Sequence, residues 1–460
     1  MYTSEFLAKY GFTEEEWTSC LKVLSQLKDN PFENPDNDRF GALVTKIHKT
    51  AKKQLRKSAY QQDKSADLAV LKQATIAKNA LNGNTLFDHN TSEQKDTYTD
   101  LNFPKNCYSC NQAYQKVHFF YHRLCPACAE LNYKHRNLKV DLSGRNVILT
   151  GGRVKIGYAT SLMLLRSNAN LTVTTRFPAL ALAQFSKEKD YETWKDKLTV
   201  YGLDLRNLSA VEEFISYYKS QYKSLDVLIN NAAQTIKYEK DYYQPLIAKE
   251  NKLLPAFSQQ KSFTQNQTPV ISDTKALESI KQSVSDLALN RFGQPVDLRT
   301  KNSWNSTLEE VSTYELLEVN LINQISPFLL IREFTPLLKA STFAEKFIIN
   351  VTSSEGQFSY HNKTIFHPHT NMTKAALNMM TKTSAAAYAK DKIFMNSVDV
   401  GWVSTGAHEI LREKQFEAGY IPPLDPVDGA ARILHPVYEG LENKVYIAGE
   451  LLKNYQIIDW

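Results

Sequence analysis

The stretch NVILTGGRVKIG, residues 146–157, decides the fold. Its first five residues form a short apolar run, which predicts a buried strand, and a glycine turn leads from that run into a helical pattern. Glycines at a strand-to-helix turn let the backbone approach a phosphate group placed at the helix N-terminus. The stretch therefore predicts the first βα unit of a nucleotide-binding sheet. A glycine cluster alone is weak evidence, so the rest of the chain has to agree with it.

Further apolar runs alternate with helical patterns along the remainder of the chain. They are residues 170–175, 197–201, 226–229, 346–351, 394–400 and, as the last strand, 444–448. Strands that alternate with helices indicate βαβ units and a parallel sheet. We therefore predict an α/β fold, a doubly wound parallel Rossmann sheet over residues 141–460, preceded by a helical region and a small zinc-binding module.

Length and composition exclude several classes of protein. The 460 residues allow two to four domains, and 42% hydrophobic with 23% charged residues suit a packed core. No apolar run approaches the roughly 20 residues that span a bilayer, and the N-terminus does not have the pattern of a signal peptide. We therefore expect a cytoplasmic protein with no membrane partner. The formal net charge of +6 permits an anionic ligand but does not argue for nucleic acid.

Four of the five cysteines form the pattern C-x2-C-x14-C-x2-C within residues 101–140. This spacing suits a tetrahedral zinc ion, which each pair would hold from one tight turn. The four ligands would be Cys107, Cys110, Cys125 and Cys128. Because they fill all four positions, the zinc would be structural. Two disulfides or free thiols are the alternatives, and both fit less well without a secretory signal. His118 and His122 are spare candidate ligands or ordinary residues of the module.

Residues 1–100 predict a helical region that ends in a linker over 82–104. Within the helix predicted at about 40–81, Lys46, Lys49, Lys53 and Arg56 share one face. That face offers a phosphate site, and a solvated helix surface is the alternative. The basic helix and the zinc module together raise nucleic-acid binding as a second alternative function. Acids and bases are balanced over residues 1–100, and no base-reading module is recognisable, so we do not expect a nucleic-acid partner.

Polar motifs follow the predicted strands in a fixed order. They are Asp204-Leu205, Asn230-Asn231-Ala232-Ala233, Asn320, Thr352-Ser353-Ser354 and Lys374. With the glycine turn, they resemble the short-chain dehydrogenase/reductase (SDR) family over residues 142–460. The marks of that family are a TGxxxGxG turn, a DL, an NNAG, an Asn–Ser–Tyr–Lys catalytic set and a PG near the sixth strand. The resemblance implies an oxidoreductase with a small-molecule carbonyl or alcohol substrate, and it suggests a homo-oligomer.

The resemblance also implies a role for each matching residue. Asp204 would approach the adenine, and Asn230 would line the ribose side. Asn320 would hold a proton-relay water, and Ser353 would polarise the substrate carbonyl. Lys374 would bind the nicotinamide ribose and lower the pKa of the catalytic acid.

The residues after the second predicted strand bear on the choice of cofactor. Sites that prefer NAD(H) place an acid there to accept from the ribose 2′-hydroxyl, but this chain has Arg176 and no acid. Arg176 can pair with a 2′-phosphate, and Arg153 and Lys155 add positive charge at the glycine turn. We therefore predict NADP(H) over NAD(H), with a surface arginine as the alternative. The candidate cofactor-binding residues are Thr150, Gly151, Gly152, Arg153, Lys155, Ile156, Gly157, Arg176, Asp204, Leu205, Asn230, Ala232, Lys374 and Gly401.

The chain departs from the family pattern at three places. Lys155 replaces the middle glycine of the turn, and the Pro-Gly pair appears as Val400-Gly401. Thr370 stands where the family has its tyrosine, four residues before Lys374. A tyrosine starts near pKa 10 and a lysine can lower that value, whereas an aliphatic hydroxyl is far less acidic. Thr370 is therefore a poor general acid.

Three other side chains are candidate proton donors. Tyr360 lies in the long loop before Thr370, and His367 and His369 carry imidazoles suited to proton transfer near neutral pH. Each can equally be a structural loop residue. Two hypotheses follow: an NADP(H)-dependent SDR-type oxidoreductase with an atypical proton donor, or a catalytically inactive NADP(H)-binding scaffold or sensor.

An insertion of about 75 residues, 234–308, lies between the NNAA motif and Asn320. It is rich in Gln, Ser, Lys and Tyr, and a helical pattern occupies its centre at 274–288. Ligands of doubly wound sheets bind at the carboxyl ends of the strands, where this insertion begins. We expect a lid or a partner surface, with a disordered decoration as the alternative.

Overall fold

The computed structural model describes residues 9–83, 98–258, 260, 263–265, 289–297, 299, 301–359, 363–404 and 409–460. These residues belong to two compact units, Met1–Leu68 and Ala69–Trp460. The boundaries that we predict at residues 100 and 140 both lie within the second unit, and they remain a prediction about sequence modules.

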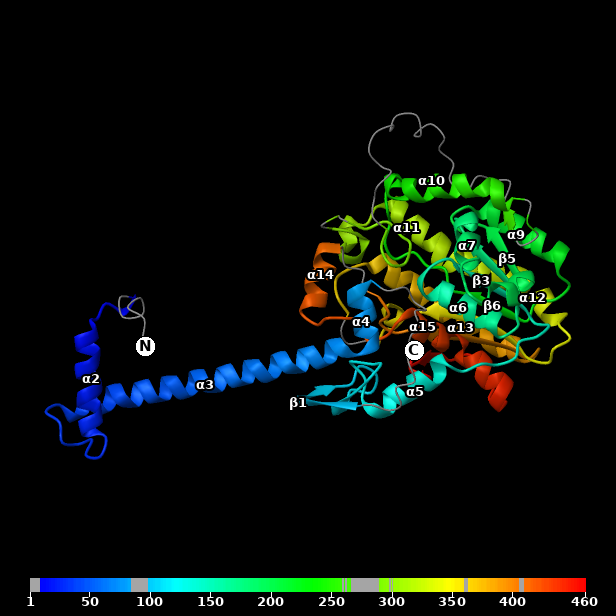
Figure 1. Ribbon diagram of the computed structural model, residues 1–460. Helices are drawn as coiled ribbons and strands as arrows, with labels where there is room; N and C mark the ends of the chain where they lie inside the picture. The colour runs from blue at the N-terminus through cyan, green and yellow to red at the C-terminus, as the bar shows by residue number, and fades with distance from the viewer. Residues whose placement is uncertain are drawn as a thin grey trace. The chain divides into compact units, whose positions relative to one another are not determined.

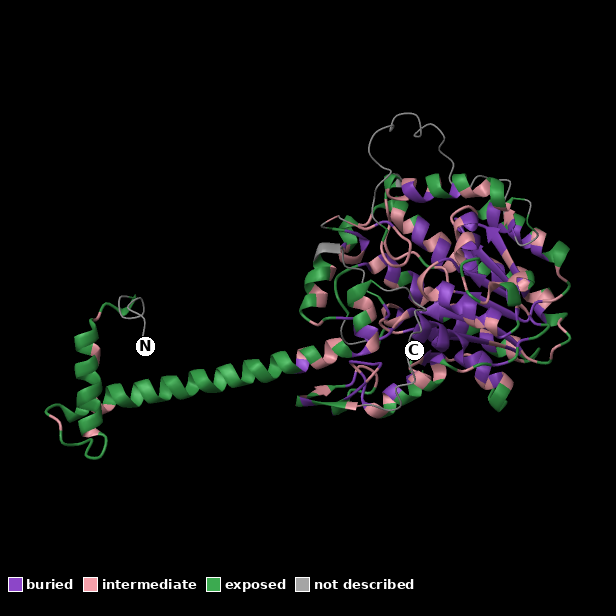
Figure 2. Cartoon of the chain, viewed as in Figure 1, coloured by how far each residue is buried: buried purple, intermediate pink, exposed green. Residues whose placement is uncertain are grey.

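The first unit is helical, as the sequence predicts. Helix α2 (Glu14–Leu27) begins with a capping box, in which the Thr13 hydroxyl accepts from the backbone N–H of Glu16 and the Glu16 carboxylate accepts from that of Thr13. Helix α3 (Asn37–Gln73) carries the basic face, whose four side chains are all exposed. Figure 2 shows the same exposure along α2, none of whose residues is buried. Burial of a core therefore begins in the second unit.

The second unit contains a nine-stranded sheet in the order β11-β10-β9-β8-β6-β3-β4-β5-β7. Only the edge pair β10–β11 is antiparallel. The strands are β3 (Asn146–Thr150), β4 (Asn170–Thr175), β5 (Leu198–Gly202), β6 (Val227–Asn230), β7 (Phe263–Gln265), β8 (Lys346–Thr352), β9 (Ile393–Asp399), β10 (Leu451–Lys453) and β11 (Gln456–Ile458). The six strands predicted between residues 146 and 400 are confirmed to within one residue at each end.

Helices cover both faces of this sheet because neighbouring strand residues point to opposite sides. Val147 and Leu149 belong to one buried cluster, whereas Ile148 belongs to the other. The first cluster contains side chains of α6 (Lys155–Arg166), α7 (Pro178–Phe185) and α15 (Pro426–Tyr438). The second contains side chains of α9 (Leu208–Gln221), α12 (Ser326–Lys339) and α13 (Pro368–Ala389). The doubly wound α/β fold is thereby confirmed.

The last predicted strand, 444–448, is wrong. A π-helical turn, η7 (Glu439–Asn443), ends at Lys444 in the left-handed region, and the next residues form no strand. The Asn396 side chain donates to the carbonyl of Ile447 and so occupies a backbone group that a strand would pair. Leu451 and Leu452, further along, are buried and belong to strand β10, which lies between β9 and the edge strand β11.

The linker predicted over 82–104 is wrong at its end, because β1 (Tyr98–Asn106) begins there. β1 pairs with β2 (Ala113–His118), and α5 (Pro126–Arg136) follows this hairpin. Most β1 side chains face solvent, which is why the segment is polar enough to resemble a linker. Hairpin and helix together form what we call the cysteine module, residues 98–136.

The cysteine module packs against α15 and the segment before it, next to the Rossmann sheet. Tyr121 and Leu124 share a buried cluster with Val403 and Leu424. At its edge Arg136 pairs with Asp425 and Asp428, each at 2.9 Å. A buried ion pair of this kind fixes a specific docking geometry, since either partner alone would be an uncompensated charge.

The described part of the insertion flanks the same sheet. Helix α10 (Lys240–Phe257) packs on α7, where the Glu250 carboxylate accepts from the backbone N–H groups of Ala179 and Leu180 at 2.7 and 2.8 Å. β7 adds a parallel strand beside β5. Figure 1 shows α10 on one side of the unit and β1 and α5 on the other. The helix predicted at 274–288 lies outside the described residues.

Among the helices that the structure describes, none combines the length and the apolarity that a membrane span requires.

Candidate active site

The glycine turn after β3 packs tightly on the loop after β6. A Cβ atom on Gly151 would lie 3.0 Å from Cα of Ala232, and one on Gly157 would lie 2.0 Å from the carbonyl oxygen of Gly151. The Thr150 hydroxyl accepts from the backbone N–H groups of Asn231 and Ala232 at 3.1 and 3.0 Å. The turn therefore leaves no room for side chains at these glycines, and it presents the start of α6 at the carboxyl edge of the sheet.

Lys155 is the first residue of α6 and has a φ of 51°. That conformation suits glycine and strains other residues, which explains why the family has a glycine here. Burial lowers the pKa of Lys155 to about 8, and the positive charges of Arg412 and Arg291 add to this effect. Perturbed groups of this kind gather at functional sites.

Two arginines lie together beside the turn. Arg153 is 8% exposed, and burial followed by the charge of Arg176 lowers its pKa to about 10. Arg176 stacks on Tyr243 of α10, 4.6 Å from the ring centre, and its buried Nη1 has no hydrogen-bond partner among the described residues. Two neighbouring like charges repel each other, so this pair favours a nearby anion, and the Glu250 carboxylate already acts on Arg153 in this way.

The candidates on the adenine side are held by neighbouring side chains. The Asp204 carboxylate accepts from Nε of Arg206 at 3.0 Å, and Arg206 also pairs with Glu318. The Asn230 side chain donates to Asn350 at 2.8 Å, while its own Oδ1 is buried without a partner in the described structure. Leu205 is buried, and its carbonyl accepts from Ser326. The predicted contacts of these residues with adenosine remain predictions.

Lys374 of α13 packs against the carboxyl end of β8 and the turn that follows Ser353. Ser353 precedes the short turn η6 (Ser354–Gly356), and a Cβ on Gly356 would lie 2.8 Å from the carbonyl carbon of Lys374 in α13. Lys374 Nζ donates to the carbonyl of Val351 at 2.7 Å. Burial lowers the pKa of Lys374 to about 8, although the charges of Glu355 and Asp399 act in the opposite direction.

The lowered pKa of Lys374 predicts how the stability of the protein depends on pH. Its pKa in the folded protein lies below the ordinary 10.5, so burying the cation costs stability below pH 8. Lys374→Met should therefore raise the melting temperature of the cofactor-free protein near neutral pH. The gain should shrink as pH rises from about 8 toward 10.5, because the folded-state lysine then loses its proton. Thermal melts across this range provide the measurement, and a gain that grew with pH would contradict the assignment.

The structure does not bring Asn320 to this edge. Asn320 ends α11 (Thr313–Asn320), and its side chain donates to the carbonyl of Leu316 in the same helix at 2.7 Å. Asn323 lies in the π-helical turn η5 (Leu321–Ile325) that follows. It is 1% exposed and donates to Thr373, next to Lys374, and to the carbonyl of Gln234, which follows β6. Asn323 therefore connects α13 to the loop after β6, and the role predicted for Asn320 remains a prediction.

The candidate proton donors have different surroundings. Thr370 is buried, and its hydroxyl has no partner among the described residues. Nε2 of His369 lies 3.3 Å from Oε1 of Glu315, and the His367 ring stacks on Trp304 at 4.3 Å. Both imidazoles thus face the segment 303–315. Tyr360 lies outside the described residues.

The four cysteines of the module come together. Their Sγ atoms all lie within 4.8 Å of one another, and those of Cys110 and Cys125 are 3.7 Å apart. A tetrahedral zinc with bonds of about 2.3 Å would place its sulfurs roughly 3.8 Å apart, so the cluster fits this ion. Nδ1 of His118 accepts from the backbone of Phe120, and Nε2 of His122 lies 3.2 Å from the carbonyl oxygen of Ile421. Both histidines thus have partners apart from the cluster.

The cysteine module also touches the turn after β9, a contact that the sequence did not predict. The hydroxyl of Tyr108, next to Cys107, accepts from the backbone N–H of Trp402 at 2.7 Å. The guanidinium of Arg123 lies 5.1 Å from the Trp402 ring centre. Gly401, in the left-handed region, faces the same tyrosine, and a Cβ atom there would lie 3.2 Å from the hydroxyl. The module therefore braces the turn that carries the predicted cofactor residue Gly401.

Comparison with known proteins agrees with this fold. Residues 145–283 match the family model described as short chain dehydrogenase, and residues 286–421 match the one described as enoyl-(acyl carrier protein) reductase. The chain is 30% identical over 357 residues to the uncharacterized protein R665 of Acanthamoeba polyphaga mimivirus, which covers 72% of this chain and 71% of that protein.

Two named enzymes match shorter segments. The chloroplastic protochlorophyllide reductase of Pisum sativum is 30% identical over 132 residues, 28% of this chain and 33% of the reductase. Human retinol dehydrogenase 13 is 32% identical over 94 residues, 20% of this chain and 28% of the dehydrogenase. The matched part spans a third or less of each enzyme.

Among solved structures, the carbonyl reductase Sniffer of D. melanogaster has a TM-score of 0.45 at 18% identity, with 69% of this chain and 100% of that chain covered. The Pseudomonas aeruginosa RhlG/NADP complex has a TM-score of 0.45 at 16% identity, with 68% and 95% covered.

Proposed function

Because this chain belongs to the short-chain dehydrogenase/reductase family, whose members are oxidoreductases, we propose that it is an NADP(H)-dependent oxidoreductase. It acts on a carbonyl or alcohol group and uses an atypical proton donor. The observation that carries the cofactor choice is the pair Arg153, which is buried, and Arg176, which is partly buried, after the neighbouring strands β3 and β4. A 2′-phosphate would supply an anion that can pair with both guanidiniums.

The residues of the site suit carbonyl chemistry. The bound nicotinamide would supply or accept the hydride. The turn 150–157 would hold the diphosphate, aided by the N-terminus of α6. The Ser353 hydroxyl would donate to the substrate oxygen, where charge develops during hydride transfer. Lys374 would position the ribose, and Asn323 lies next to Thr373 where it can order a relay water.

The direct test follows NADPH oxidation by the full chain with a panel of aldehydes and ketones. Ser353→Ala should lower kcat/KM by about 100-fold, because it removes one donor to the developing oxyanion. The matched control is Thr383→Ala on the exposed side of α13, which should leave turnover unchanged. A parent protein that binds NADPH but turns over no substrate would instead support the scaffold or sensor hypothesis, which the loss of the family tyrosine favours.

The proton donor is tested by a pair of variants that each remove one hydroxyl. Thr370→Val should change kcat by less than about threefold, because an aliphatic hydroxyl does not donate a proton effectively near neutral pH. Tyr360→Phe should lower kcat by about tenfold or more if the long loop brings this phenol to the substrate. Steady-state rates at saturating NADPH provide the measurement. A large loss for Thr370→Val with none for Tyr360→Phe would reverse the assignment.

The four-cysteine cluster is, in our proposal, a structural zinc site. Four thiolates would fill every coordination position of the zinc ion, so the ion would support folding and take no part in the reaction.

A further inference from the structure

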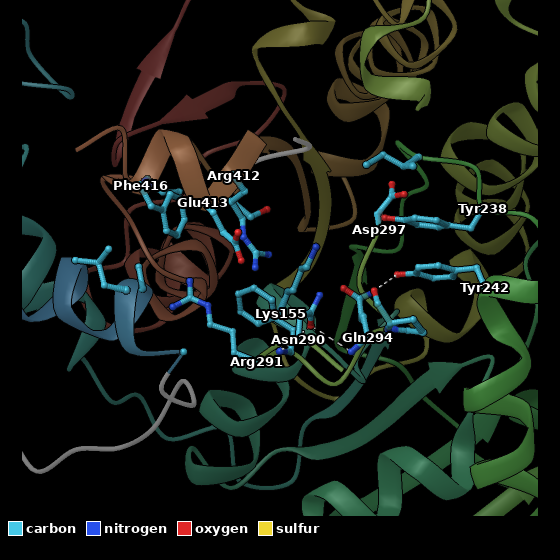
Figure 3. A pocket seen from close by; sticks show the side chains of 18 of the residues that line it. Lys155, Tyr238, Tyr242, Asn290, Arg291, Gln294, Asp297, Arg412, Glu413 and Phe416 are labelled. Atoms are coloured by element: carbon cyan, nitrogen blue, oxygen red, sulfur yellow. Dashed lines mark hydrogen bonds between the residues drawn. The ribbon is translucent and has the colours of Figure 1, made fainter. Parts of the chain in front are cut away.

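A pocket of about 450 Å³ opens beside Lys155 (Figure 3). One wall comes from the described parts of the insertion, residues 236–242 and 290–297. The opposite wall comes from α14 (Glu409–Glu417), and α4 (Thr75–Asn82) closes one side. These segments meet outside the carboxyl ends of the strands, where doubly wound sheets bind ligands.

Three cations reach into this pocket from three distant parts of the sequence. They are Lys155 of the glycine turn, Arg291 of the insertion and Arg412 of α14. Besides burial, the groups that lower the pKa of Lys155 are these two arginines. Arg291 also donates to the carbonyl of Asn79 at 3.1 Å, which holds its side chain in place. The pocket therefore concentrates positive charge.

The acids of the pocket compensate this charge only in part. Asp297 is bound by Arg299, whose Nε donates to it at 2.8 Å. Glu413 and Glu417 are exposed. Burial lowers the pKa of Arg412, and this effect is larger than the opposite effect of the Glu413 charge. An anion bound beside Lys155 would offset the repulsion from the two arginines that lower its pKa.

The remaining walls are flat and aromatic. The Phe292 ring lies 5.5 Å from Lys155 Nζ and 4.7 Å from the Arg291 guanidinium. Tyr238 and Tyr242 stack at 3.7 Å, and the Tyr242 hydroxyl donates to the carbonyl of Pro295 at 2.9 Å. The two stacked tyrosine rings thus form a flat surface on the insertion side of the pocket, and this hydrogen bond holds Tyr242 in place (Figure 3).

We propose that this pocket binds the anionic end of the substrate, a carboxylate or phosphate group attached to a planar apolar body. Lys155, Arg291 and Arg412 hold the anion, and the aromatic walls cover the apolar body. This inference rests on the proposed function, since it names the class of substrate for the same site. The cofactor diphosphate is the other source of the same chemistry, because Lys155 begins the helix against which that group would lie.

The experiment uses phenyl phosphate as the probe and phenol as its neutral counterpart. Each is titrated by calorimetry into the full chain, with and without saturating NADPH. We expect phenyl phosphate to bind the NADPH-saturated protein and phenol to bind at least tenfold more weakly. Arg291→Gln and Arg412→Gln should each weaken phenyl phosphate binding about tenfold, a usual effect of removing a charged hydrogen-bond donor. Lys414→Gln, an exposed cation on the same helix, should not.

Three results would overturn the proposal: no binding to either form, equal binding by all variants, or binding to the free protein that NADPH abolishes. The third would assign the cations to the cofactor phosphates. Thermal melts of each variant identify any that fail to fold, and one folded arginine variant suffices. NADPH binding is measured separately. If the protein did not bind NADPH, the proposed function would be rejected, but phenyl phosphate binding by the same variants without NADPH would still test whether the pocket holds an anion.

Discussion

Cys125→Ser is expected to release the zinc that we propose for the cysteine cluster and to destabilise the second unit by about 3 kcal/mol or more. Cys125 is 8% exposed and is the N-cap residue of α5, so its loss removes a ligand at the start of the helix. The hairpin buries few side chains of its own, and a structural zinc typically supplies much of the folding free energy of such a small module. Elemental analysis and thermal melts provide the measurement.

The control for this variant is Cys20→Ser, which alters an exposed cysteine outside the cluster. It should leave both the metal content and the melting temperature unchanged. If Cys125→Ser retained one zinc per chain, the four-thiolate assignment would be wrong. If the parent contained no zinc when purified without chelators, the cluster would need another explanation.

Metal loss should also weaken cofactor binding, because the module braces the turn after β9. Tyr108 and Arg123 both contact Trp402, and both belong to the module. Release of the metal would free this turn and with it Gly401. Tyr108→Phe separates the two effects, since it keeps the four thiols and removes only the hydroxyl that accepts from Trp402. An NADPH affinity reduced in Cys125→Ser but unchanged in Tyr108→Phe would mean that the hydroxyl contact itself is not what couples the module to the cofactor.

Local patterns were sufficient for six strands of the sheet and for the cysteine cluster, but not for β7, β10 and β11. Strands β3, β4, β5, β6, β8 and β9 are short apolar runs between helical patterns, and a buried parallel strand has that signature. The cysteine spacing fixes the cluster because each pair lies within one tight turn. In contrast, the segment 444–448 has the composition of a strand, but the Asn396 side chain donates to the carbonyl of Ile447 there. That contact depends on tertiary structure, which the sequence pattern does not contain.

The candidate site was predictable only in part. Asn320 and Asn323 both lie in one helical pattern, and Asn323 belongs to the π-helical turn that follows Asn320 and donates to Thr373. Nothing in the sequence marks that turn. Arg291 and Arg412 were also missed, because they lie 121 positions apart in the sequence and only the fold brings them to Lys155. The glycine turn and Lys374 were recognised because each lies in a motif of adjacent residues.

The cofactor preference should depend on the arginine pair beside the glycine turn. Arg153→Gln and Arg176→Gln should each weaken NADPH binding by about 10- to 100-fold, since a hydrogen bond to a charged group contributes about 1.5–3 kcal/mol. NADH binding should change by less than about threefold, because NADH has no 2′-phosphate for these guanidiniums to hold. Titration of both cofactors, followed by the quenching of protein fluorescence, measures the two affinities in one preparation.

A control variant separates this local effect from net charge. Arg332→Gln removes one exposed positive charge from α12, far along the chain from the turn, and should leave both affinities unchanged. If NADH binding fell as much as NADPH binding in the Arg153 and Arg176 variants, the arginines would be supporting the turn itself, not reading the 2′-phosphate. The double variant should then bind neither cofactor, whereas under our proposal it should bind both with similar, weak affinity. The ratio of the two affinities, which a general loss of folding would not alter, therefore decides the question.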